Sequence, residues 1–179
     1  TGLTAPAWAQ ASAGAVLRVG HQKGWLSIIK ARGTLEKRLA PLGVKVTWKE
    51  FNAGPVQLEA LNVGSIDFGD VGEAPPIFAQ AAGAPLVYAG ATVPRPALEA
   101  VIVPSGSAIR SVADLKGKRV AYNKGSNVHY FLVKLLEKHG LKYADVQSVF
   151  LAPADARPAF AKGTVASWTI PYPFLASAQ

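Results

Sequence analysis

The chain has 179 residues, of which 50% are hydrophobic and 17% charged, so it is long and apolar enough to fold around a core. Its net charge is +8, but the Lys and Arg residues are scattered along helical segments, which argues against nucleic acid binding. No stretch reaches the roughly 18 consecutive apolar residues that a membrane-spanning helix needs, and the absence of cysteine excludes a disulfide framework.

The first residues resemble the end of a secretory leader. Residue 1 is not Met, and Ala7, Trp8 and Ala9 fit the small-x-small pattern at which signal peptides are cleaved. We therefore expect residues 1–15 to be a leader remnant and the protein to act in the periplasm. An alanine-rich terminus without function is the alternative.

Short strand-like segments alternate with amphipathic helical patterns, which is typical of a mostly parallel α/β sheet. In the first half we expect strands at 16–20, 45–51, 66–72 and 85–93, and helices at 27–39, 56–64 and 74–83. In the second half we expect strands at 98–104, 119–123, 146–151 and 165–170, and helices at 126–140 and 154–163. Ser111 and Asp114 form a capping pattern that starts a further short helix.

The Pro-rich segment 94–97 predicts a crossover between two lobes. We expect lobe 1 to comprise residues 16–94, the hinge residues 95–100, and lobe 2 residues 101–179.

Four predicted strand-to-helix turns combine glycine with polar residues, at 21–24, 52–55, 69–76 and 123–127. Because such turns lie together at the carboxyl ends of parallel strands, they predict one shared ligand site. Glycine lets the backbone approach closely, and each helix start offers free N–H donors. The pattern therefore predicts an anion site.

Several residues of these turns have simpler explanations as well. Lys23 fits a solvated lysine, His21 a hydrogen-bonded turn histidine, and Ser126 a helix N-cap that can also donate to a ligand oxygen. Ser126 and His129 are three apart on one helix, but nothing orders a third catalytic group.

Three segments carry a family resemblance: "GHQKGWL", "NAGPVQLEALNVGSIDFG" and "SVADLKGKRVAYNKGSNVHYFLVKLLEKHG". They resemble the aliphatic sulfonate-binding proteins of bacterial ABC importers, relatives of the taurine- and nitrate-binding proteins. The resemblance implies a periplasmic binding protein type II fold, with two α/β lobes and a hinge. It also implies that an aliphatic sulfonate is trapped between the lobes and delivered to a membrane ABC permease.

The resemblance implies ligand contacts at Gln22, Lys23, Gly24, Ala53, Gly54, Pro55, Val71, Gly72, Glu73, Lys124, Gly125, Ser126, Asn127 and His129. We expect the anionic head to take N–H bonds from the Gly72 and Gly125 turns and charge from Lys23 or Lys124. The apolar tail would lie against Trp25, Phe51 or Pro55.

Two departures from the family pattern stand out. Ala166 replaces an aspartate, and Pro171 and Tyr172 replace a Trp-Asp pair, so we expect the cleft to lack an acid and an aromatic wall. The family also returns to lobe 1 after lobe 2, whereas this chain ends at Gln179. We therefore expect lobe 1 to be incomplete, either because the chain is a fragment or because a covering partner or domain-swapped copy packs there.

We expect no catalytic residue, no metal and no cofactor. Asp67 and Asp70 are the nearest approach to a metal site, but no further ligand completes a set. The alternative from another class is an enzyme of the same architecture that resembles pyrimidine-forming proteins, in which a histidine is consumed and a pyridoxal cofactor takes part. A binder of taurine, nitrate or sulfate is the nearer alternative.

Overall fold

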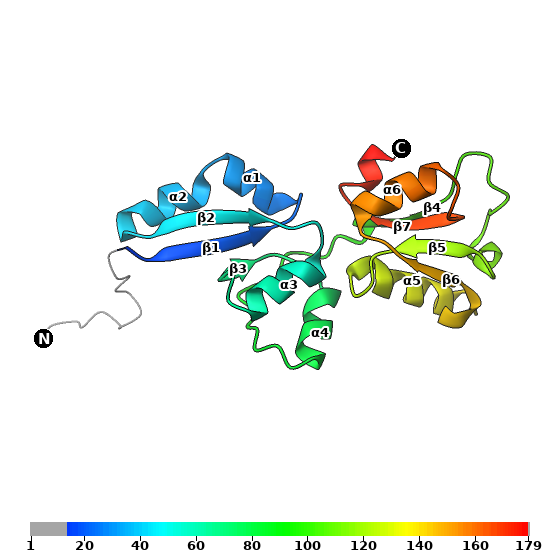
Figure 1. The fold of residues 1–179 in the computed structure, drawn as a ribbon, viewed down its shortest axis with the longest axis horizontal. Helices are drawn as coiled ribbons and strands as arrows, with labels where there is room; N and C mark the ends of the chain where they lie inside the picture. Colours follow the sequence, from blue (N-terminus) through cyan, green and yellow to red (C-terminus); the bar gives the residue numbers. More distant parts are fainter. Residues whose placement is uncertain (1–13, 179) are drawn as a thin grey trace, which may run out of the picture.

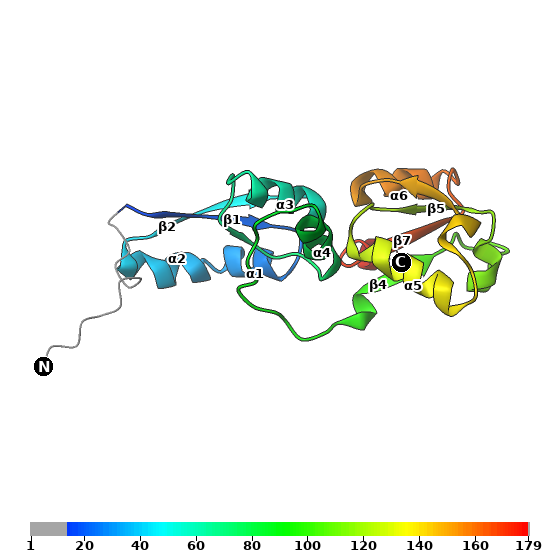
Figure 2. The same ribbon diagram turned by 90° about the horizontal axis from the view of Figure 1, so that it is seen from below.

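Two separate β-sheets, each with helices on both faces, organise the chain (Figures 1 and 2). The computed structural model describes residues 14–178, so the predicted cleavage pattern at Ala7, Trp8 and Ala9 lies outside the described residues. Among residues 14–178, no helix is both long and apolar enough to cross a membrane. The two α/β lobes of the predicted periplasmic binding protein fold are present.

Lobe 1 is built on a three-stranded parallel sheet. Its strands are β1 (Val16–His21), β2 (Lys45–Glu50) and β3 (Phe68–Gly69), in the order β2-β1-β3. Its helices are α1 (Trp25–Ala31), α2 (Thr34–Leu39), α3 (Gly54–Asn62) and α4 (Ala74–Ala81). Helices α1 and α2 lie on one face of the sheet and α3 on the other (Figure 2).

Lobe 2 repeats this plan and adds an antiparallel edge. Its strands are β4 (Glu99–Ile102), β5 (Arg119–Tyr122), β6 (Gln147–Phe150) and β7 (Ser167–Pro171), in the order β4-β7-β5-β6. Its helices are α5 (Asn127–Lys138) and α6 (Pro153–Ala161), on opposite faces of the sheet. Strand β4 runs antiparallel to β7, while β5 is parallel to both its neighbours.

In both sheets the first strand of the parallel series lies in the middle. Strand β1 lies between β2 and β3, and β5 lies between β6 and β7, so the strand order reverses beside β1 and beside β5. Ligands of open α/β sheets bind outside the carboxyl ends of the strands at such reversal points. The arrowheads of β1 and β5 point toward each other, so the two reversal points face each other across the lobe boundary (Figure 1).

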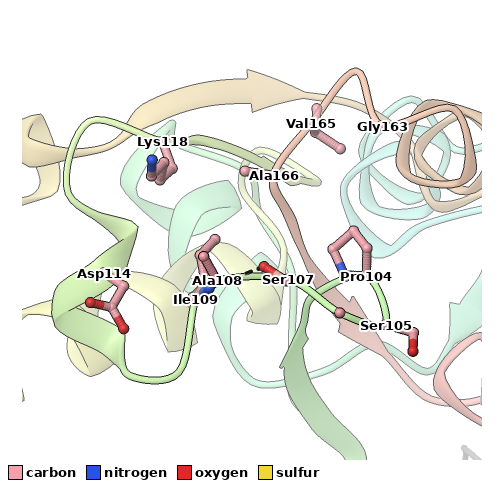
Figure 3. Close-up of a pocket in the computed structure, with 11 residues that line it drawn as sticks. Pro104, Ser105, Ser107, Ala108, Ile109, Asp114, Lys118, Gly163, Val165 and Ala166 are labelled. Carbon is pink, nitrogen blue, oxygen red and sulfur yellow. Dashed lines mark hydrogen bonds between the residues drawn. The ribbon is translucent and has the colours of Figure 1, made fainter.

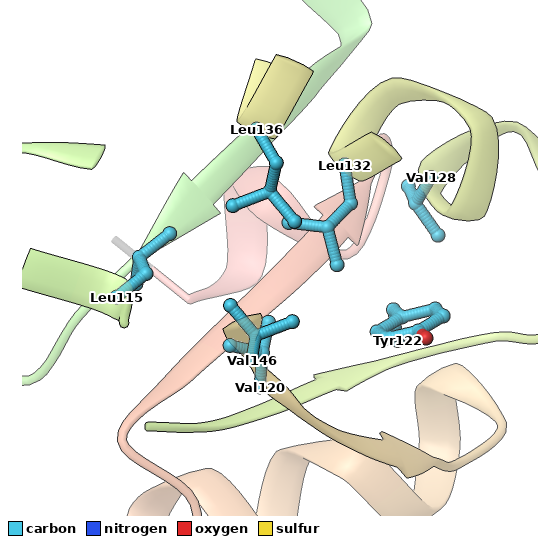
Figure 4. Packing of buried hydrophobic residues seen from close by; sticks show 7 residues of the cluster. All are labelled: Leu115, Val120, Tyr122, Val128, Leu132, Leu136 and Val146. Carbon is cyan, nitrogen blue, oxygen red and sulfur yellow. The ribbon is translucent and has the colours of Figure 1, made fainter. Parts of the chain in front are cut away.

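Lobe 2 has the larger core. Val128, Leu132 and Leu136 recur every fourth residue on α5 and pack against Val120 and Tyr122 of β5 (Figure 4). On the other face, Trp168 and Ile170 of β7 pack against α6. The buried apolar residues of lobe 1 are mostly small or isolated, and large apolar side chains remain exposed on α4 and after it.

Three predicted elements of lobe 1 are wrong in extent or existence. The predicted helix 27–39 is two helices, because Gly33 adopts a left-handed φ of +60° that interrupts the hydrogen-bond series. The predicted strand 66–72 is reduced to the two residues that pair with β1.

The predicted strand at 85–93 is also wrong. Residues 84–95 contain no strand, and Val87 and Val93 are 89% and 73% exposed. A strand needs a neighbour for its backbone groups, and within the described chain β3 pairs only with β1. Apolar composition alone therefore did not make this segment a strand.

The chain passes from lobe 1 to lobe 2 through residues 95–100, and we propose this segment as the hinge. The predicted strand at 98–104 begins at Glu99 as β4 and belongs to the second sheet. The remaining predicted strands and helices of lobe 2 are confirmed to within a few residues.

The α5 packing makes a direct prediction. Replacing Leu132, which is fully buried, with Ala should lower the free energy of unfolding by about 3 kcal/mol, because it leaves a cavity between α5 and the sheet. Leu42→Ala is the control, since Leu42 is 57% exposed and should change stability by less than about 1 kcal/mol. Urea unfolding followed by circular dichroism measures both; equal effects would contradict this packing.

Candidate functional site

Predicted site turns from the two lobes meet where the lobes touch. A Cβ on Gly125 of lobe 2 would lie 3.7 Å from Pro55 of lobe 1. The ring of Phe78 on α4 stacks on His129 of α5, with centroids 6.0 Å apart and planes 8° apart. The structure therefore brings together the turns before α3, α4 and α5, as the sequence predicts. Phe78 was missed, because an apolar residue on an amphipathic helix looks like a core residue.

Asn127 provides the polar contact between the lobes. Its Oδ1 accepts a hydrogen bond from the Ala74 N–H at 3.1 Å, and its Nδ2 donates to Glu73 Oε2 at 2.8 Å. A Cβ on Gly72 would lie 2.0 to 2.3 Å from the side-chain amide atoms of Asn127, far inside van der Waals contact. Glycine at position 72 is therefore required for this approach.

The turn at 22–24 joins the same region from the lobe 1 side. Gln22 Nε2 donates to the Asp70 carbonyl at 3.3 Å, which links this turn to the segment after β3. Lys23 and Gly24 are exposed, and Trp25 is 39% exposed. The role of Trp25 against a ligand tail stays a prediction, as does that of Phe51, which packs beside Gly20.

His21 is buried at the end of β1. Its Nδ1 lies 3.2 Å from Ser27 Oγ and 3.1 Å from the Gln22 carbonyl, and its Nε2 lies 3.2 Å from Lys30 Nζ. Because an ammonium can only donate, a hydrogen bond from Lys30 requires Nε2 to accept, which leaves Nδ1 for the oxygens of Ser27 and Gln22. The expectation of a hydrogen-bonded turn histidine fits this geometry.

Lys124 lies at the carboxyl end of β5, with its Nζ 5.2 Å from the centroid of the Phe150 ring. Burial lowers the pKa of His129, and the positive charge of Lys124 lowers it further. Both effects favour the neutral imidazole, whose Nδ1 accepts from the Gly125 N–H at 3.2 Å. The Gly125 N–H that we expected to meet the anionic head is thus already engaged.

Ser126 occupies the N-cap position of α5, but its hydroxyl makes no capping bond. It donates instead to the Asn123 carbonyl at 2.7 Å. Ser126 and His129 therefore each bond to a different backbone group and do not form a nucleophile–base pair. Among residues 14–178, no group of three His, Cys, Asp or Glu side chains could hold a metal ion.

Glu99 is a further acidic group of this contact that sequence reasoning missed. Burial raises its pKa to about 6, and the nearby Glu73 carboxylate adds to the rise, while a hydrogen bond with Asn127 opposes it. Nothing in its local sequence distinguishes it, because its position depends on β4 joining the edge of the second sheet.

Ala166 does not face the lobe boundary. It lies at the amino end of β7, in a hollow of about 590 Å³ lined also by Pro104, Ser107, Asp114, Lys118 and Gly163 (Figure 3). The expectation that Ala166 removes an acid from the cleft is therefore wrong, because β7 runs parallel to β5 and its amino end lies at the far side of the sheet. Pro171 ends β7 opposite Glu99 of β4, and Tyr172 is exposed.

Comparison with known proteins gives concordant matches. A sequence model described as NMT1/THI5 like matches residues 40–175. An Escherichia coli K12 protein named for binding aliphatic sulfonates is 51% identical over 164 residues, which cover 90% of this chain and 51% of the relative. The taurine-binding periplasmic protein of Escherichia coli K12 is 29% identical over 123 residues, which cover 69% of this chain and 38% of that relative.

Solved structures similar to this chain are also named for binding sulfonates. The alkanesulfonate-binding protein of Xanthomonas axonopodis pv. citri bound to MOPS has a TM-score of 0.87 and 51% identity, with 92% of this chain and 57% of that chain covered. The periplasmic aliphatic sulphonate binding protein of Escherichia coli has a TM-score of 0.79 and 50% identity, with 92% of this chain and 56% of that chain covered. The chain spans about half the length of the curated relatives it matches.

The Gly72–Asn127 approach is testable. Gly72→Ala should separate the lobes, because the added methyl group overlaps the Asn127 amide and its two hydrogen bonds, together worth about 1 to 3 kcal/mol, are lost. Small-angle X-ray scattering should then give a larger radius of gyration. Gly24→Ala is the control, since its φ is −140° and a Cβ there meets no atom within 4 Å. Identical scattering from all three proteins would rule out this contact.

The buried Glu99 carboxyl predicts that the stability of the fold depends on pH. The pKa of the Glu99 carboxyl in the folded chain lies above the ordinary carboxyl value. At low pH this carboxyl is protonated in both the folded and the unfolded chain, so its burial does not lower the free energy of unfolding there. Stability should fall by about 1 kcal/mol as pH rises through about 6, after allowance for the solvent that still reaches the side chain.

Urea unfolding between about pH 4 and pH 8 measures this difference, with the Glu99→Gln variant free of it. Glu137→Gln, on the exposed face of α5, is the matched control and should follow the parent chain. A parallel pH profile for the parent and Glu99→Gln would contradict the assignment.

Proposed function

We propose that the chain, which belongs to the NMT1/THI5-like family, forms the two lobes of a periplasmic solute-binding protein that takes an aliphatic sulfonate between them and delivers it to a membrane ABC permease. The observation that carries this proposal is the meeting of carboxyl-end turns from both lobes at the contact of Asn127 with Glu73 and Ala74. A ligand bound beside this contact would touch both lobes and hold them together.

The chemistry of these turns suits an anion with a short apolar tail. Lys124 and Lys23 supply positive charge, and Gln22 supplies an amide donor. Helices α3, α4 and α5 begin at these turns, so their first N–H groups add partial positive charge. Pro55 and the rings of Trp25 and Phe51 would meet the tail. Exclusion of water as the lobes close would strengthen each hydrogen bond to the head.

The relatives support binding over catalysis. The matched proteins are named for binding sulfonates or taurine, and two of these names state a periplasmic location. We propose the same location for this chain, with residues 1–15 as the remnant of its leader. The net charge of +8 would raise the local concentration of an anionic ligand.

Further polypeptide is proposed to cover lobe 1. Ile77, Val87 and Val93 are all more than half exposed, and they lie on α4 and in the segment after it. We retain the proposal that a covering segment or a second copy of the chain packs over these residues.

The binding proposal predicts the effect of Lys124. Calorimetry with short alkanesulfonates should show micromolar or tighter binding that weakens by about tenfold in Lys124→Ala, because the anionic head loses its charged partner at the carboxyl end of β5. Lys134→Ala removes the same charge from the exposed face of α5, where Lys134 pairs with Glu137, and should bind like the parent. Equal affinity of all three proteins would remove Lys124 from the site, and no binding by the parent would overturn the proposed function.

A further inference from the structure

Gln57 is a buried polar residue of α3 that donates hydrogen bonds to three separate backbone segments of lobe 1. It is 1% exposed, and its backbone N–H donates to the Ala53 carbonyl at 3.3 Å. Its side-chain Nε2 donates to the carbonyls of Gly20 at 3.3 Å and Asp70 at 3.0 Å. Turning the amide over would place its oxygen against these two carbonyls, so the bonds require this orientation.

Each of the three carbonyls lies in a predicted ligand turn or directly before one. In chain order, the carbonyls are those of Gly20, Ala53 and Asp70, and the turns are those at 21–24, 52–55 and 69–76. A hydrogen bond holds its donor and acceptor about 3 Å apart. The three turns of lobe 1 are therefore held relative to one another through a single residue.

Two paired glycines make room for the Gln57 amide. Gly20 of β1 and Gly69 of β3 are partners in the sheet. A Cβ on Gly69 would overlap Gln57 Nε2, and a Cβ on Gly20 would lie 3.2 Å from Gln57 Cγ. The amide thus lies directly against the backbone of both strands, and its position is closely specified.

Packing alone does not account for a glutamine at this position. Within residues 14–178, Gln57 Oε1 is shielded from solvent and has no hydrogen-bond partner. A buried acceptor without a donor is unfavourable, and an apolar side chain of similar length would fill the same space without that cost. The two bonds from Nε2 are therefore what a glutamine contributes here and a methionine would not.

The Asp70 carbonyl connects Gln57 to the lobe contact. Gln22, a predicted ligand contact, also donates to this carbonyl, at 3.3 Å, so two amides share one acceptor. Two residues further along, Gly72 meets Asn127 of lobe 2. A displacement of the Asp70 carbonyl would therefore affect both the first ligand turn and the approach of the two lobes.

We propose that Gln57 is a positioning residue of the sulfonate site, which holds the three ligand turns of lobe 1 in their binding arrangement before the ligand arrives. This inference rests on the proposed function, because it assigns Gln57 to the same site. Gln57 itself does not touch the ligand. A site whose donors are already in place binds more tightly, because less of the chain has to be ordered on binding.

The first test measures affinity. Gln57→Met removes the amide and keeps the length of the side chain, and calorimetry of the full chain with propane-1-sulfonate should show binding at least about tenfold weaker than in the parent. Gly69→Ala should have the same effect, because its methyl group displaces the amide. Leu58→Ala is the matched control: the next residue on α3 is also buried, and this variant should lower the midpoint of thermal unfolding at least as much as Gln57→Met yet bind like the parent.

The second test needs no ligand. Amide hydrogen exchange reports local opening of the backbone. In Gln57→Met, exchange should be faster than in the parent at residues 20–24 and 69–73, because these turns have lost their shared donor. Leu58→Ala should leave these turns at the exchange rates of the parent.

The outcomes separate this inference from the proposed function. Parent-like affinity in Gln57→Met overturns the positioning role while the proposed function stands. An equal loss of affinity in Leu58→Ala also overturns it, because the stability of lobe 1 would then explain both results. If the parent binds no sulfonate, the proposed function fails, and the exchange measurement decides whether Gln57 holds the turns: unchanged exchange overturns this role and faster exchange supports it. Should Gln57→Met not fold, Gly69→Ala takes its place in both tests.

Discussion

The two-sided hydrogen bonding of Asn127 is the interaction on which the arrangement of the site depends. Its amide accepts from one backbone N–H of lobe 1 and donates to one carboxylate of lobe 1, so it joins the two lobes at two points. This works only because Gly72 has no side chain to hold the backbone away. The turns after β3 and β5 are brought into contact by this one side chain, and each stands at the reversal point of its own sheet.

The two lobes contribute unequally to holding that contact in place. In lobe 2, α5 is anchored by Val128, Leu132 and Leu136, so the turn that carries Asn127 rests on a rigid support. In lobe 1, the corresponding turns rest on close backbone approaches, such as that of Gly54 to Pro75, where a Cβ would lie 2.9 Å from the proline ring. The local positions are therefore tightly specified, although the lobe 1 core is small.

Much of the fold, and the meeting of the strand-to-helix turns between the lobes, was predictable because the determinants are local. The spacing of apolar residues on α5 and the glycines after β1 and β5 follow from short stretches of sequence, and parallel sheets place such turns at one edge. The features that the sequence does not predict depend on pairing between strands that are distant in the sequence. Segment 85–93 has strand composition without a neighbouring strand, and the position of Ala166 follows from the direction of β7 beside β5. The unpartnered oxygen of Asp70 depends on distant pairing as well, since Asp70 directly follows β3, which pairs with β1.

Charges of both signs meet at the lobe contact. Lys124 lies at the carboxyl end of β5, and helices α3, α4 and α5 begin beside the contact, which favours an anion there. Glu73 is the N-cap residue of α4 and Glu99 lies near it, so acidic groups adjoin the same helix starts. Asn127 donates a hydrogen bond to Glu73 without adding a charge of its own. The local arrangement of these charges, more than the total of +8, therefore sets the electrostatic field at the lobe contact.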